Sequence, residues 1–171
     1  MSSNFNDKEY NSIIKVYIED EMVKCLKNIP HHDSNRLNHC IKVSRTSYNI
    51  CKKLHFNYKS AAKAGLLHDL YYNRISEMNL FGDKFKLFAN EHPEDAMYNA
   101  DRIFGLNDLE KNIILSHMWP VSKHFPKYKE SFVVSLVDKF YSIKEFSKKW
   151  NYQLTYTMGV WFLLITTFIF Q

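Results

Sequence analysis

The chain contains very few residues that interrupt a helix. Only four glycines and four prolines occur in 171 residues, whereas β-sandwiches and barrels need frequent turns. Hydrophobic residues make up 46% of the chain, which is enough to fill the core of one domain of this length. The sequence therefore predicts a single all-α domain built from long helices.

The first half of the chain shows two helical patterns. Apolar residues recur at helical spacing from Ile13 to Leu26, which predicts a first helix that ends before Pro30. A second helix is expected to begin at a cap formed by Asp33 or Ser34 and to run to about Leu54.

The middle of the chain contains the most apolar helix. The run 60–70 is apolar almost all round and rich in small residues, which predicts a buried central helix. Periodicity fades over 71–91, where an irregular loop bordering a site is expected. Further helices are expected over 93–104, 108–117 and 129–150.

The charge of the chain constrains its partners only weakly. The formal net charge is +5, but lysines and arginines are dispersed among acidic residues. A solvated surface explains this pattern better than a binding face, and no specific nucleic-acid binding is expected.

The cysteines and the N-terminus indicate the compartment. Cys25, Cys40 and Cys51 have no paired spacing, so they are expected to be buried thiols in a reducing cytoplasm. Residues 1–8 are too polar and acidic for a signal or transit peptide. A cytoplasmic location is therefore expected.

The C-terminal segment differs from the rest of the chain. Residues 151–171 carry no charge and follow Lys148 and Lys149, so we divide the chain into a domain over 1–150 and an uncharged C-terminal helix over 151–171. This helix is either a packed tail, on the domain or across a dimer, or a membrane anchor, although several polar residues dilute the ~20 apolar positions that a span needs. Membrane contact is expected only if this segment is an anchor, and the sequence specifies no oligomeric state.

Four ionisable residues stand in apolar surroundings. His68 and Asp69 end the most apolar helix, His39 lies one helix earlier, and Asp138 interrupts the apolar run 132–141. A single core histidine is usually a packing residue, but buried ionisable groups are unfavourable unless they are paired or bind a metal. Asp138 cannot easily pair with the next residue, because neighbours in a helix point about 100° apart. A metal ion is the better partner.

The order of these four residues resembles the signature of the HD superfamily of metal-dependent phosphohydrolases. Arg36, one turn before the first histidine, and the Ala-Gly-Leu-Leu run 64–67 are similar to the family context. The resemblance covers 33–147, and the stretches 116–120 and 129–131 are most similar to those of small bacterial HD proteins. It implies a helical bundle with the metal site between its central helices.

Two further histidines resemble those of HD proteins that hold two metals. His92, followed by Pro93, and His117 would bind a second ion, with Asp69 bridging the two ions and the other three ligands holding the first. Some two-metal families have a second histidine where this chain has Met118. The alternative is one ion, with His92 and His117 contacting a substrate phosphate.

The resemblance implies a metal-dependent hydrolase. One or two divalent ions of Mn, Fe, Ni, Co or Zn would suit these ligands, and a metal-bound hydroxide would attack the phosphate ester of a nucleotide or small phosphorylated metabolite. Asp69 would act in catalysis as the bridging ligand, and Arg36 and Lys139 would contact the phosphate or protonate the leaving group.

Alternatives to hydrolysis use the same scaffold. A di-iron HD oxygenase would keep the same ligands, whereas a non-catalytic HD signalling or binding module would have no need of them. Three of the other four histidines, His31, His32 and His55, match no family position and are expected to be surface or capping residues.

Overall fold

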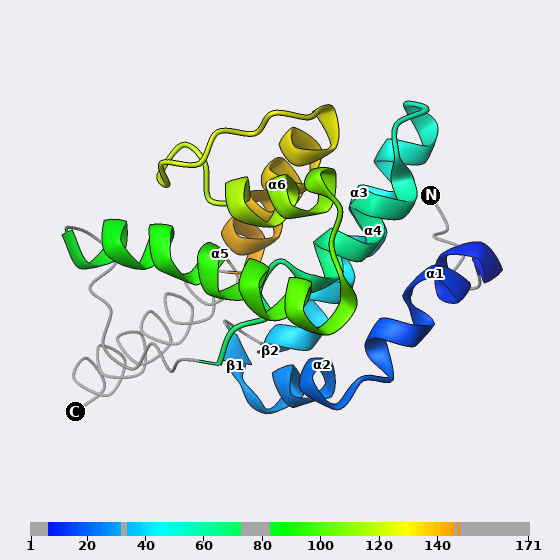
Figure 1. Ribbon diagram of the computed structural model, residues 1–171, viewed down its shortest axis with the longest axis horizontal. Coiled ribbons are helices and arrows are strands. Elements are labelled where there is room, and N and C mark those ends of the chain that lie inside the picture. Colours follow the sequence, from blue (N-terminus) through cyan, green and yellow to red (C-terminus); the bar gives the residue numbers. More distant parts are fainter. Residues whose placement is uncertain (1–6, 32–33, 73–82, 146, 148–171) are drawn as a thin grey trace, which may run out of the picture.

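The computed structural model describes residues 7–31, 34–72, 83–145 and 147, with the backbone alone described over 83–89. Helices dominate this part of the chain (Figure 1). The sheet that it contains is a two-stranded antiparallel ribbon, in which β1 (Pro30–His31) pairs with β2 (Ser34–Asn35). The prediction of an all-α fold is confirmed.

The expected first helix is divided into three elements. They are α1 (Lys8–Ile18), α2 (Glu21–Cys25) and the 3-10 helix η1 (Leu26–Asn28). The prediction of one continuous helix is therefore wrong. The break lies at Asp20, because its carboxylate accepts hydrogen bonds from the amides of Met22 and Val23 and so starts a new helix.

Helix α3 (Arg36–Lys53) begins at a cap other than the predicted ones. The Asn35 side chain accepts a hydrogen bond of 2.9 Å from the amide of Asn38, so Asn35 is the capping residue. Ser34 belongs to β2 instead, and Asp33 lies outside the described residues.

Helix α5 (Asp83–Phe104) begins ten residues before Pro93, where a helix was expected to start. Pro93 lies inside the helix, where its missing amide removes a helical hydrogen bond without ending the helix. The loop expected over 71–91 is therefore wrong from Asp83 onward, and residues 73–82 lie outside the described part of the chain.

Helix α6 (Asp108–Ser116) and a final helix over 129–145 follow. A capping box starts α6, in which the Asn107 side chain accepts from the Glu110 amide and the Glu110 carboxylate accepts from the Asn107 amide. Both helices were predicted, although residues 148–150 of the expected final helix lie outside the described residues.

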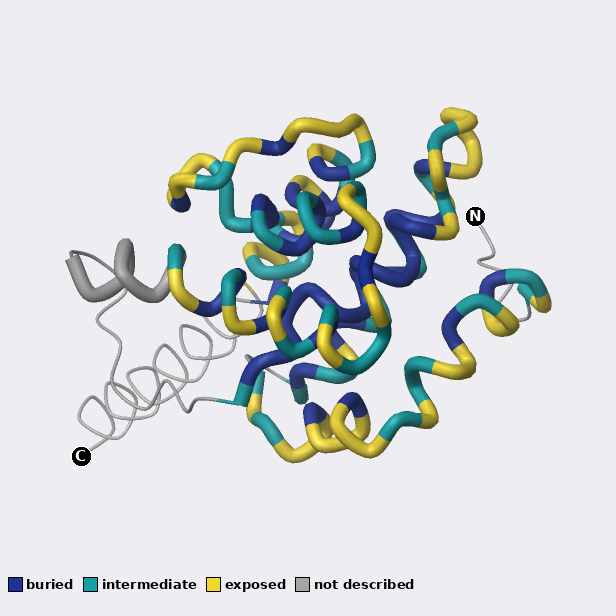
Figure 2. The backbone as a smooth tube through the Cα atoms, in the orientation of Figure 1, coloured by how far each residue is buried: buried dark blue, intermediate teal, exposed yellow. Residues whose placement is uncertain are grey.

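Helix α4 (Tyr58–Leu67) occupies the centre of the bundle. It contacts α1, α3, α5 and α6, and its residues from Ser60 to Leu67 are all buried. Figure 2 shows this buried stretch in dark blue between the other helices. A Cβ atom at Gly65 would lie 3.1 Å from the Cα of Ser44, so the glycine permits α3 and α4 to approach closely. The predicted small-residue central helix is confirmed.

The cysteines are not all buried. Cys40 and Cys51 lie in the core, and burial raises the pKa of the Cys51 thiol to about 12. Cys25 is exposed, so the expectation of three buried thiols is wrong there. The reason is that α2 is a single short turn whose buried residue is Val23.

Within the described residues, no helix combines the length and the apolar character that crossing a bilayer requires. The segment 151–171, for which a packed tail or a membrane anchor was expected, lies outside them.

Replacing Gly65 with Ala should destabilise the protein. In an exposed helix this change raises stability by up to about 1 kcal/mol, but here the new Cβ would press on the backbone of Ser44. Overpacking of this kind costs about 1–3 kcal/mol, so we expect the free energy of unfolding in urea to fall by about 1–2 kcal/mol. A rise in that free energy would contradict the close approach of the two helices.

Candidate metal centre

The structure brings together all six residues that the sequence singled out as ligands, and all six are buried. They are His39 on α3, His68 and Asp69 just after α4, His92 on α5, His117 just after α6, and Asp138 on the final helix. They form three overlapping groups whose ligand atoms lie within 4.8 Å of one another, namely His39, His68 and Asp69, then His68, His117 and Asp138, and then Asp69, His92 and His117. Five segments that are far apart in sequence thus meet at one point.

Two of the histidines are placed by helix ends. His68 and His117 are the C-terminal capping residues of α4 and α6. Each Nδ1 donates a hydrogen bond to a carbonyl three residues earlier, at 2.9 Å for Gly65 and 2.6 Å for Ile114. The proton on Nδ1 leaves the lone pair of each Nε2 for the centre of the cluster. Because helix C-termini carry partial negative charge, this arrangement favours a cation.

The lone pair of His68 Nε2 faces the carboxylate of Asp138. Its Oδ1 lies 2.9 Å from His39 Nε2 and 3.5 Å from His68 Nε2, and the latter atom is buried without a hydrogen-bond partner in the described part of the chain. Such atoms need a proton or a metal cation between them. Imidazole nitrogens and carboxylate oxygens together suit divalent transition metals, so the residues fit a bound ion of this class.

Asp69 lies between the two halves of the cluster. Its Oδ2 is 3.8 Å from His68 Nε2, while its Oδ1 is 3.7 Å from His92 Nε2 and 3.8 Å from His117 Nε2. The last two nitrogens are 2.9 Å apart, and His92 has to donate because His117 carries its proton on Nδ1. An ion could replace that proton, and the two oxygens of Asp69 face the two halves of the cluster.

The charges of the cluster are set by mutual contacts. Burial alone would raise the pKa of Asp69, but the neighbouring His68, His92 and His117 hold it well below its usual range. Likewise, burial opposes ionisation of Asp138, and the hydrogen bond from His39 keeps its pKa low. Both carboxylates are therefore ionised at neutral pH, as metal ligands must be.

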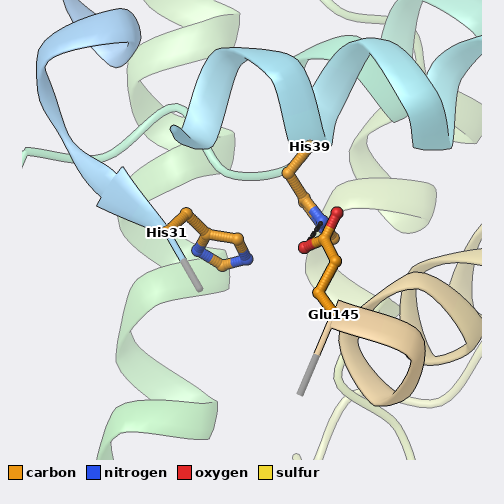
Figure 3. Close-up of side chains that lie close together, drawn as sticks. All are labelled: His31, His39 and Glu145. Atoms are coloured by element: carbon orange, nitrogen blue, oxygen red, sulfur yellow. Dashed lines mark hydrogen bonds and ion pairs between the residues drawn. The ribbon is translucent and has the colours of Figure 1, made fainter. Parts of the chain in front are cut away.

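One residue next to the cluster was missed by the sequence analysis. Glu145, on the final helix, places its Oε2 3.3 Å from His39 Nδ1 (Figure 3). Its Oε1 accepts a hydrogen bond of 2.7 Å from the ammonium of Lys42. The available signal was its position two helical turns after Asp138, which places both carboxylates on one helix face.

The three histidines that match no family position have different environments. His31 was expected at the surface or in a cap, which is wrong, because its ring centroid lies 4.5 Å from that of His39 (Figure 3). The β1–β2 ribbon turns it toward the start of α3, which local sequence does not reveal. His55 is exposed and takes the left-handed conformation (φ 57°) directly after α3, as a surface residue at a helix end. His32 lies outside the described residues.

The two predicted phosphate-contacting residues have partners within the protein. The buried Arg36 guanidinium stacks 3.8 Å from the ring centroid of Tyr71 and donates to its carbonyl, and that ring lies 5.1 Å from the ring of His92. Lys139 Nζ donates to the His117 carbonyl at 2.8 Å, so it is directed to the end of α6. Lys139 therefore contacts His117 directly, and Arg36 reaches His92 through the ring of Tyr71.

Fold and site together define an all-α protein with a buried His/Asp cluster of the metal-binding type. The family model described as HD domain matches residues 36–142, which include all six residues of the cluster. The chain therefore belongs to the HD superfamily, most of whose members are metal-dependent hydrolases. No curated protein and no solved structure is significantly similar to the chain.

Metal binding to chelator-treated protein should release protons. Burial would lower the pKa of His39, but hydrogen bonds to Asp138 and Glu145 raise it to about 10, so His39 is protonated at pH 7. A ligating imidazole is neutral, and the ion must displace this proton. His117 contributes none, because burial and its histidine neighbours lower its pKa to about 3.

We therefore expect about one proton or more to be released per ion bound at His39, and affinity to rise with pH until about pH 10. Isothermal titration calorimetry in buffers of different ionisation enthalpy measures the proton count. An affinity that does not change between pH 6 and pH 9 would contradict this assignment of charge.

Proposed function

We propose that this protein hydrolyses a phosphate ester in a reaction that depends on one or two divalent metal ions. The observation that carries the proposal is the convergence of six buried imidazole and carboxylate side chains at the ends of α4 and α6. A purely structural polar cluster would be satisfied by its own donors, whereas His68 Nε2 is buried opposite the Asp138 carboxylate without a hydrogen-bond partner in the described part of the chain. The family matched by residues 36–142 supports the same class of reaction.

A bound divalent ion would supply a water of lowered pKa, about 7, and would offset the negative charge of a phosphate. We assign the first ion to His39, His68, Asp69 and Asp138, and the second to His92 and His117 with Asp69 shared between them. The ionised carboxylates of Asp69 and Asp138 keep these ligands ready at neutral pH.

Two cations stand near the cluster for an anionic substrate. We propose that Arg36 and Lys139 contribute positive charge at the phosphate. Arg36 stacks on Tyr71, whose ring lies beside that of His92, and Lys139 donates to the His117 carbonyl. A nucleotide or another small phosphorylated metabolite is the substrate class that these charges suit, consistent with the positive net charge of the chain.

The direct test combines metal content with a substrate screen. Protein purified without chelator should contain Mn, Fe, Ni, Co or Zn, and should hydrolyse at least one phosphomonoester, phosphodiester or nucleotide in a metal-dependent manner. Asp69→Ala should abolish both properties, because one oxygen of this carboxylate faces His68 and the other faces His92 and His117, whereas His55→Asn at the exposed end of α3 should change neither.

Three outcomes would overturn the proposal in distinct ways. Oxygen uptake by the Fe(II) form without phosphate release would identify a di-iron oxygenase. Metal binding without turnover of any phosphate ester would leave a non-catalytic module. Unchanged metal content in Asp69→Ala would remove the ligand assignment itself.

The number of ions can be tested through the second group. His92→Ala should lower bound metal from two equivalents toward one, because this imidazole belongs to the Asp69 and His117 side of the cluster. His39→Ala should disturb the better-furnished first site and reduce affinity or activity about 10- to 100-fold or more. If the wild type binds a single equivalent and His92→Ala raises only KM, then the site holds one ion and His92 contacts substrate.

A further inference from the structure

We infer that Glu145 is a positioning residue, which acts through His39, and that Lys42 holds Glu145 in place. This inference rests on the proposed metal centre, but not on the reaction carried out there. It concerns a buried carboxylate that lies outside the six-residue cluster and that the family signature in this sequence does not include.

The contacts form a chain of three side chains. Glu145 is 3% exposed, and its two oxygens are divided between two partners, His39 Nδ1 at 3.3 Å and Lys42 Nζ at 2.7 Å. On its other side, the His39 ring presents Nε2 to Asp138 at 2.9 Å. The order is therefore Lys42, Glu145, His39, and then the metal cluster.

The two helices fix the positions of these three side chains. His39 and Lys42 are three residues apart on α3, so they lie on the same face, and Asp138 and Glu145 are seven residues apart on the final helix, again on one face. His39 and Lys42 of α3 thus contact the two carboxylates of the final helix. The ring of His39 is held at both nitrogens and has little freedom to rotate.

The consequence concerns the proton on His39. When an ion displaces the second proton of His39, a carboxylate at Nδ1 keeps this nitrogen the donor, so Nε2 is the nitrogen that presents its lone pair to the metal. His68 and His117 obtain the same tautomer from backbone carbonyls at helix ends, whereas His39 is in the interior of α3 and has Glu145 instead. Carboxylates that orient a ligating histidine in this way typically contribute about 10- to 100-fold in metal affinity or activity.

A third metal site is the competing interpretation. His31, His39 and Glu145 present ligand atoms within 4.8 Å of one another (Figure 3). However, the ammonium of Lys42 already lies 2.7 Å from Glu145, and a metal ion on this carboxylate would have to approach that cation. The positive partner that Glu145 needs is therefore supplied by the chain.

The experiment measures metal affinity rather than turnover. Glu145→Gln keeps the shape of the side chain and removes its charge, and we expect the Co(II) affinity of the His39 site, measured by competition with a chromophoric chelator, to fall about 10-fold or more. The Co(II) absorption spectrum should change, since one ligand is less well oriented. Glu130→Gln is the matched control, because Glu130 lies on the same helix but accepts from the Asn57 amide instead, and its affinity and spectrum should match the wild type.

Lys42 gives a second, independent test. Its side chain is 41% exposed, so Lys42→Met should fold even if Glu145→Gln does not. We expect Lys42→Met to weaken Co(II) binding in the same direction, and Lys42→Arg to restore it. In the double variant the two losses should not add, because both act through one interaction.

The outcomes separate the interpretations. Wild-type affinity and spectrum in Glu145→Gln and Lys42→Met would overturn the inference and leave Glu145 as a structural tie between helices. Loss of one whole equivalent of metal in both Glu145→Gln and His31→Ala would instead identify a third metal site. If the wild type itself binds no metal, the proposed function fails together with the inference, and that result is distinguishable from the other two.

Discussion

The structure depends on the burial of two ionised carboxylates among imidazoles whose lone pairs converge. Removing such groups from water is unfavourable unless protons or a metal ion lie between them. Asp69 and Asp138 meet this condition only because five segments deliver their side chains to one point. The packing of α3 on α4, permitted by Gly65, and the ends of α4 and α6 are therefore best understood as the means of assembling this cluster.

Part of the cluster was predictable from marks that burial leaves in the sequence, whereas His92 and His117 came from the family resemblance. Asp138 interrupts an apolar run, and His68 with Asp69 ends the most apolar helix, so burial could be read from neighbours alone. The central helix was predictable for the same reason. The helix starts were harder, because Asp20 starts a new helix within one apolar pattern and Asn35 follows two other suitable capping residues, Asp33 and Ser34.

Glu145 and His31 could not be assigned in this way. Glu145 has Lys144 beside it and Ile143 before it, and its spacing of two helical turns from Asp138, which is the one signal in the sequence, does not identify the residue that it contacts. Its role arises from the packing of the final helix on α3. Glu145 is 106 positions from His39 and 103 positions from Lys42 in the sequence. His31 similarly reaches His39 only through the β1–β2 ribbon. Residues that support a ligand are therefore less visible in sequence than the ligands themselves.

The final helix shows how the site and the fold are connected. Apart from Val134 and Val137, the residues that it buries are polar, namely Ser131, Ser135, Asp138 and Glu145. Its attachments run to Asn112, to the His117 carbonyl, and to His39 and Lys42 on α3. Val133 and Tyr141 also pack partly buried against the core, and these apolar contacts act together with the polar ones, of which those to His117 and His39 lead to the cluster. A metal ion held by His39 and Asp138 would bind the folded form alone and thereby stabilise the packing of this helix. The Asp138 carboxylate, which is part of the ligand set, thus also attaches the final helix to α3 through His39.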